Sequence, residues 1–159
     1  MSASVLERLE RVLRSGLSVA ASLVLAAIAV ICFLEVILRY VYGDSFPWYD
    51  EFVGYLLVWL TFLAAVLAQS HRQHIGIENL LERLPEGRRR VVELLNHALL
   101  AAVHVVLLVY GAQLVSRFLS ENAITLPVPM GVVYSVIPVY AALMLVVEAI
   151  SIARLAGAR

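Results

Sequence analysis

The sequence predicts an all-α integral membrane protein with four transmembrane helices and short interfacial amphipathic helices. Three observations predict this fold class: the composition, four long apolar stretches, and the lack of the period-two alternation that marks a transmembrane barrel. The 159 residues are 62% hydrophobic and 15% charged, whereas soluble domains are about 45–50% apolar and about 25% charged. A soluble domain this small could not bury so much apolar surface. The composition argues against a soluble enzyme, a disordered tail and a disulfide scaffold.

The four predicted spans cover residues 15–38, 52–70, 94–116 and 130–150. Each is close to the roughly 20 residues that cross an apolar core of about 30 Å. The first contains no charged residue and no histidine from Ser15 to Leu34. Because this is longer than the roughly 7–15 residues of a signal-peptide core, we expect it to be retained. The chain then forms one membrane domain over residues 1–159, with helix contacts at small residues such as Gly54 and Ala101.

Two shorter segments, residues 1–14 and 77–84, carry apolar residues at helical spacing on one face and Arg or Glu on the other. This pattern is typical of a helix that lies in the membrane interface. Pro85 follows the second segment and ends it. We expect both segments to anchor the protein to membrane lipids, with docking against a partner as the alternative.

The arginines predict the orientation of the chain. All twelve basic residues are arginine, and ten of them lie in the N-terminal segment, the loop between the second and third spans, and the C-terminus. Only Arg39 and Arg117 lie on the other side. The positive-inside rule therefore predicts that both termini are cytoplasmic. The net charge is zero, so a nucleic-acid partner has no electrostatic support.

The loop after the first span combines charged and aromatic residues. Glu35 precedes Arg39 by one helical turn, a spacing at which the two charges can pair. Asp50 and Glu51 open the second span, where carboxylates favour the positive helix end, and one of them could reach Arg39. Tyrosine and tryptophan in this loop are typical of the headgroup level. We interpret the loop as a corner that fixes the first two spans, with ion translocation as the alternative.

Histidines are the other candidate functional residues. His97 and His104 share a face of the third span, so they could ligate haem or bond a neighbouring helix, although no second span contains a partner histidine. His71 and His74 lack further metal ligands nearby. Glu148, near the end of the fourth span, is expected to pair with Arg154 or a headgroup. Without a nucleotide, zinc or nucleophile motif, we predict no enzyme activity, catalytic residue, cofactor or metal site.

The spans hold few polar residues and no detectable repeat, which favours an accessory subunit over a translocation pathway. Several short motifs point the same way: Arg39 followed by Phe46-Pro47-Trp48-Tyr49-Asp50-Glu51, then Arg72-Gln73-His74-Ile75, Leu84-Pro85, Pro129-Met130, Tyr134 and Ile137-Pro138. In this order and spacing they resemble the small membrane subunit (small permease, DctQ-like) of tripartite ATP-independent periplasmic (TRAP) transporters. The chain departs from the family pattern at Ala64, Gly76 and Glu78.

The resemblance implies a bacterial inner-membrane complex. A large membrane subunit would import an organic acid with sodium by an elevator movement, and a periplasmic substrate-binding protein would deliver that acid. The small subunit would pack on the scaffold of the large one, as a separate chain ending at Arg159. The residues expected to fix its fold or its partner interface are Glu35, Arg39, Pro47, Trp48, Asp50, Glu51, Arg72, His74, Pro129, Tyr134 and Pro138.

Three other functions stay open at this point. One is the anchor subunit of a haem- or quinone-linked oxidoreductase, which would use His97 and His104. Another is the small subunit of a tripartite tricarboxylate carrier, which also has four spans. The last is a self-associating membrane protein without a transporter. The sequence does not indicate the substrate, because specificity would lie in the partners.

Overall fold

Four long helices dominate the computed structural model, which describes residues 3–70 and 85–157. The helices are α1 (Ala3–Ile37), α2 (Tyr49–Ser70), α4 (Glu86–Arg117) and α6 (Val136–Gly157), with a π-helical turn η1 (Leu38–Tyr42) after α1 and a short α5 (Met130–Tyr134) before α6. Four helical stretches are long and apolar enough to cross a membrane, namely 10–42, 49–70, 87–117 and 130–153. The predicted four-span helical fold is therefore confirmed.

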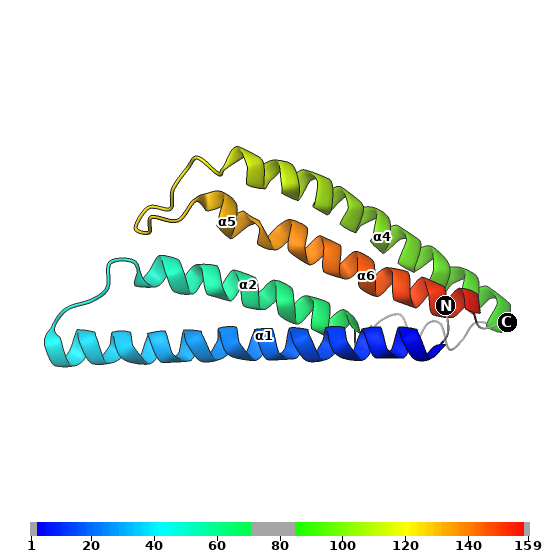
Figure 1. Ribbon diagram of the computed structural model, residues 1–159, viewed down its shortest axis with the longest axis horizontal. Coiled ribbons are helices and arrows are strands. Elements are labelled where there is room, and N and C mark those ends of the chain that lie inside the picture. The colour runs from blue at the N-terminus through cyan, green and yellow to red at the C-terminus, as the bar shows by residue number, and fades with distance from the viewer. Residues whose placement is uncertain (1–2, 71–84, 158–159) are drawn as a thin grey trace.

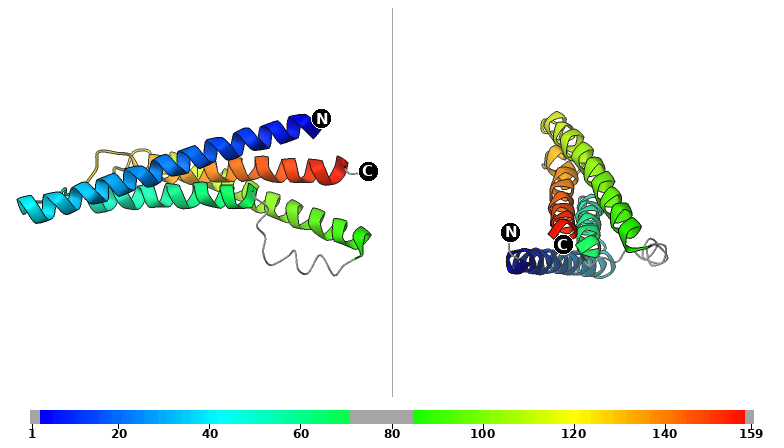
Figure 2. Two further views of the ribbon diagram at one scale, coloured as in Figure 1. Left: turned by 90° about the horizontal axis from the view of Figure 1, so that it is seen from below. Right: turned by 90° about the vertical axis from the view of Figure 1, so that its right-hand side faces the viewer.

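The helices form two hairpins that lie side by side (Figure 1). One hairpin pairs α1 with α2 and the other pairs α4 with α6, and α6 also packs on α2. Viewed from different sides, α2 and α6 occupy the centre of the bundle while α1 and α4 flank them (Figure 2). The two chain termini lie at the same end of the bundle, here called the terminal end, and the opposite end is called the loop end.

The first helix differs from the prediction at its beginning. The described part of segment 1–14 is not a separate helix, because α1 runs without a break from Ala3 to Ile37 over 35 residues. No helix-breaking residue separates Arg14 from the first span, and a helix tolerates the single Gly16. At 1.5 Å per residue α1 is about 52 Å long, more than the apolar core of about 30 Å. The predicted interfacial helix at 77–84 lies outside the described residues.

The fourth span is divided near Ser135. Pro138 stands in the first turn of α6, where proline is tolerated because the first amide groups of a helix lack intrahelical partners. Since Pro138 has no N–H, the carbonyl of Tyr134 loses the partner that a continuous helix would give it. The amide N–H of Ser135 instead closes α5 by donating to the carbonyls of Gly131 and Val132.

The apolar core is small and lies where α1, α2 and α6 meet. It consists of the buried Leu17, Val66, Met144 and Val147, with partly buried leucines and Tyr140 around them. Much of the remaining apolar surface is exposed, including Leu23 at 66%, Phe33 at 66% and Leu99 at 67%. Such a surface suits a protein whose outer faces contact lipid or another membrane protein.

Two glycines allow α4 to approach the fourth span closely. A Cβ atom at Gly111 would lie 2.9 Å from Ile137 Cγ2, and one at Gly131 would lie 2.7 Å from the carbonyl oxygen of Val115. A Cβ at Gly54 would meet nothing within 4 Å, so this glycine makes no close helix contact within the described part of the chain. Small residues let helix backbones approach, but in this bundle the close approach is between the second hairpin's own helices.

Candidate functional site: polar clusters at both ends of the bundle

Glu35 organises the corner after α1. Its side chain is 4% exposed. One carboxylate oxygen accepts a hydrogen bond of 2.9 Å from Arg39 Nη2, and the other accepts one of 3.2 Å from the backbone N–H of Phe46. The acid therefore ties the last turns of the first span to the loop that leads into α2. Both of its oxygens are used within this corner.

Aromatic rings fill the same corner. Trp48 stacks on Phe46 with ring centroids 5.0 Å apart and meets Phe52 edge-on at 5.7 Å. The hydroxyl of Tyr49 donates to Cys32 Sγ over 3.4 Å, which joins the start of α2 to α1. Pro47, which lies between Phe46 and Trp48 in the sequence, is exposed. The structure thus brings Glu35, Arg39 and the aromatic side chains together, as the sequence predicts.

Glu51 does not pair with Arg39, which corrects the predicted role of the acids that open α2. Its carboxylate accepts hydrogen bonds from the backbone N–H groups of Ile124 (2.9 Å) and Thr125 (2.7 Å), and also from the Thr125 hydroxyl. Tyr55, one turn later, donates to it over 2.5 Å. This set of contacts, here called the Glu51 bridge, connects the first hairpin to the loop between α4 and α5.

Asp50 faces another side of α2 and is exposed. Consecutive residues of a helix point about 100° apart, so the two neighbouring acids cannot serve the same contact. The charge pairing at this corner therefore involves Glu35 and Arg39, while Glu51 holds the opposite hairpin.

The residues predicted from the fourth span shape the other side of the loop end. Pro129 precedes α5, and the backbone N–H of Met130 donates to the carbonyl of Glu121 over 2.7 Å. Tyr134 meets Phe118 edge-on with ring centroids 5.2 Å apart. These contacts fold the α4–α5 loop back on itself and present its 124–125 amides to Glu51. Arg72 and His74 lie outside the described residues.

A second cluster, which the sequence analysis did not predict, lies toward the terminal end. Glu148 is 1% exposed and does not face the headgroups. Its carboxylate accepts from Gln69 Nε2 over 3.0 Å and lies 2.5 Å from His97 Nδ1. We call Glu148, His97 and Gln69 the Glu148 cluster. Its three members come from α6, α4 and α2, so the cluster joins both hairpins inside the bundle.

One signal in the sequence could have located this cluster. Ala141, Met144 and Val147 share the buried face of α6, and Glu148 follows at helical spacing from the first two. An acid on the core face of a span requires a partner, since burying an unpaired charge is costly. His97 faces α6 from the neighbouring helix and supplies that partner.

His104 lies two turns after His97 and is also buried, at 4% exposed. Its ring meets Tyr140 edge-on with centroids 5.6 Å apart, and its Nδ1 atom has no hydrogen-bond partner among the described residues. Both imidazoles therefore pack against α6. The described residues contain no group of three or more possible ligands that could hold a metal ion.

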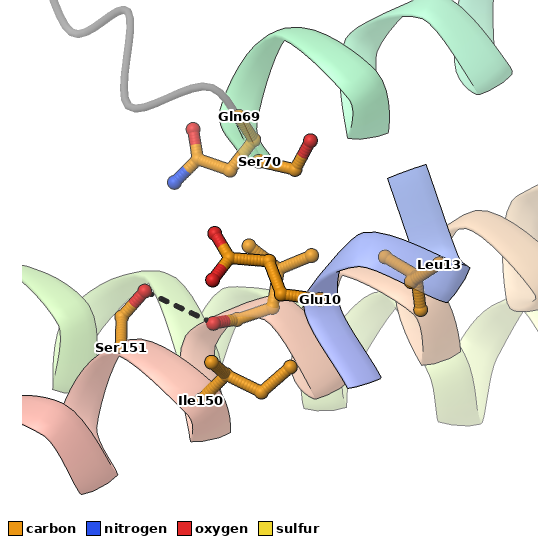
Figure 3. A pocket seen from close by; sticks show the side chains of 7 residues that line it. Glu10, Leu13, Gln69, Ser70, Ile150 and Ser151 are labelled. Carbon is orange, nitrogen blue, oxygen red and sulfur yellow. Dashed lines mark hydrogen bonds between the residues drawn. The ribbon is translucent and has the colours of Figure 1, made fainter. Parts of the chain in front are cut away.

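Arg14 fixes the terminal end of α1 to α2. Its guanidinium donates to the Glu10 carboxylate and to the backbone carbonyl of Ser70, the last residue of α2. A cation is favoured at a helix C-terminus, where carbonyls lack intrahelical partners. Beside this contact is a cavity of about 20 Å³, lined in part by Glu10, Gln69, Ser70 and Ser151 (Figure 3). It has room for about one water molecule.

A family model described as "Tripartite ATP-independent periplasmic transporters, DctQ component" matches residues 28–158. This match covers the last part of the first span, the other three spans and both polar clusters. The chain belongs to the DctQ component family of TRAP transporters.

Two curated proteins are similar to this DctQ component. A Haemophilus influenzae protein named "Putative TRAP transporter small permease protein" is 33% identical over 73 residues, which cover 46% of this chain and 45% of that protein. A Vibrio cholerae protein named "C4-dicarboxylate TRAP transporter small permease protein DctQ" is 25% identical over 99 residues, which cover 62% of this chain and 43% of that protein. The matches thus span less than half the length of either relative.

Membership in the DctQ family makes the chain a component of a transport system and a multi-pass membrane protein. The two polar clusters fit such a component. In the described residues, Glu35, Glu51 and Glu148 each accept hydrogen bonds from neighbouring elements of this chain. Their chemistry is therefore that of holding helices together.

Proposed function

We propose that this chain is the accessory small permease subunit of a TRAP-type secondary transporter. In this proposal it packs on the large membrane subunit and stabilises its scaffold, while that subunit imports an organic acid with sodium. A periplasmic substrate-binding protein delivers the acid. The chain itself carries no substrate and catalyses no reaction.

One observation supports the accessory role above the others: the outer faces of the long helices are apolar and exposed, whereas the buried acids are bound internally. Leu23, Phe33 and Leu99 are each about two thirds exposed. By contrast, Glu35 and Glu148 are nearly fully buried and satisfied within the chain. A transport pathway needs polar groups directed at a substrate, and a scaffold subunit needs apolar faces for a membrane partner.

We further propose that the chain lies in the bacterial inner membrane with both termini in the cytoplasm. The termini share one end of the bundle, and in the sequence ten of the twelve arginines lie near the two termini or between the second and third spans. The positive-inside rule places such an end in the cytoplasm. The corner around Glu35 and the Glu51 bridge would then face the periplasm, where a binding protein docks.

The substrate class rests on the family rather than on this chain. The name of the Vibrio cholerae relative specifies a C4-dicarboxylate, at 25% identity over part of each chain. We propose an organic acid, with the particular acid determined by the large subunit and the binding protein.

Purification from the native host in mild detergent tests the proposal. One large multi-span membrane protein is expected to co-purify with the tagged chain at equal stoichiometry. Deletion of the gene for the tagged chain is expected to abolish uptake of an organic acid. Isolation of the chain by itself, or with a haem- or flavin-bearing protein, would contradict the accessory role.

A further inference from the structure

A groove runs along the outer side of α4, where this helix meets α6 near the loop end. Its volume is about 480 Å³. Apolar side chains and a glycine form most of its lining, and two polar side chains lie toward the end of α4. The lining residues are Leu107, Tyr110, Gly111, Gln113, Leu114, Arg117 and Ile137.

Gly111 gives the groove its floor. A Cβ atom there would lie 2.9 Å from Ile137 Cγ2 and 3.1 Å from Pro138 Cδ. The side of α4 is thus bare where it touches α6, with Leu107 and Leu114 one turn on either side. Leu107, Leu114 and Ile137 form the apolar part of the groove beside this contact.

Arg117 stands at the polar end of the groove, in the last turn of α4. It is exposed, and it forms no ion pair with a carboxylate in the part of the chain that the structure describes. Arg39, the other arginine near the loop end, is bound to Glu35. Arg117 therefore presents a cation at the expected depth of the headgroups, beside an apolar channel, with Gln113 one turn away as a further hydrogen-bonding group.

The length of the groove fits a lipid better than a partner helix. Ten residues separate Leu107 from Arg117, which corresponds to about 15 Å along α4. This is half of the apolar thickness of about 30 Å, the depth of one leaflet. A transmembrane helix of a partner would need a groove through both leaflets, but the lining ends at Leu107.

We propose that this groove binds one phospholipid of the leaflet at the loop end. Its phosphate binds the Arg117 guanidinium with help from the Gln113 amide. One acyl chain lies along Leu107, Leu114 and Ile137. The lipid would cover the outer side of the contact between α4 and α6, and its binding does not depend on the accessory role proposed above.

Native mass spectrometry of the full chain, titrated with phosphatidylglycerol in detergent, tests the binding. Wild type is expected to hold one lipid more tightly than any further ones. Arg117→Gln should weaken this binding about tenfold, as expected for loss of a charge-assisted hydrogen bond. Leu107→Trp should weaken it by filling the channel while leaving the cation in place. Arg88→Gln, at the other end of the same helix, is the matched control.

A second measurement uses the wild-type chain in its native membrane, with its partners present. A phospholipid carrying a photoreactive acyl chain should label residues 107–117 and the start of α6 more than the other spans. Labelling spread evenly over the spans would overturn the proposal, as would unchanged affinity in both groove variants. Cross-linking of a Leu114→Cys variant to another membrane protein would show a protein occupant and would overturn it too.

Discussion

The Glu51 carboxylate accepts a hydrogen bond of 2.7 Å from the backbone N–H of Thr125, a residue 74 positions further along the chain. This contact connects the first turn of α2 to the loop of the other hairpin. Carboxylates bind backbone N–H groups more strongly than neutral acceptors do. Because Ile124 and the Thr125 hydroxyl donate to the same group, one side chain determines where the α4–α5 loop lies.

Glu51→Gln is expected to loosen this loop. The amide keeps one acceptor oxygen but loses the charge, so we expect a small loss of stability that is confined to this loop. Thermal unfolding in detergent and protease cleavage after residue 124 measure the effect. Asp50→Asn, in the same turn but outside the bridge, is the control. Equal shifts in the two variants would argue against a specific role for Glu51.

The Glu148 cluster predicts strong coupling between the half-buried His97 and the buried Glu148. His97→Leu leaves a carboxylate that is 1% exposed with Gln69 as its remaining described partner, at an expected cost of about 3–5 kcal/mol. Replacing both His97 and Glu148 with leucine removes the buried charge and should cost less than His97→Leu does. A double-mutant cycle of unfolding in micelles measures the coupling. Additive effects would show that the 2.5 Å contact contributes little.

The corner after α1 gives a third prediction. Arg39→Gln removes the cation from Glu35, whose remaining described contact is the Phe46 N–H at 3.2 Å. We expect a loss of about 2 kcal/mol, since the carboxylate is buried although Arg39 is half exposed. Thermal stability in detergent measures the loss, and Glu35→Gln combined with Arg39→Gln should restore part of it. No change in Arg39→Gln would mean that water replaces the guanidinium.

The features that can be predicted from the sequence are those that depend on residues close together along the chain. Hydropathy is a local property, so the four spans could be found, and the Glu35–Arg39 pair follows from a spacing of one helical turn. The Glu51 bridge and the Glu148 cluster join residues 73–74 and 51 positions apart. Their partners depend on how the two hairpins pack, which no local pattern determines. For the same reason, small residues in a span predict a close helix contact without showing which of them makes it.

Alanine substitutions at Gly111 and at Gly54 are expected to change the stability of the protein in opposite directions. Gly111→Ala would place a methyl group 2.9 Å from Ile137 and 3.1 Å from Pro138. Overpacking of this kind costs about 1–3 kcal/mol. Gly54→Ala adds a methyl group where nothing lies within 4 Å, inside a helix that favours alanine over glycine by up to about 1 kcal/mol. Unfolding temperatures in the same detergent should fall for the first variant and rise for the second. A rise for both would mean that α4 and α6 can separate at this point without loss, and the contact at Gly111 would then not determine how the second hairpin packs.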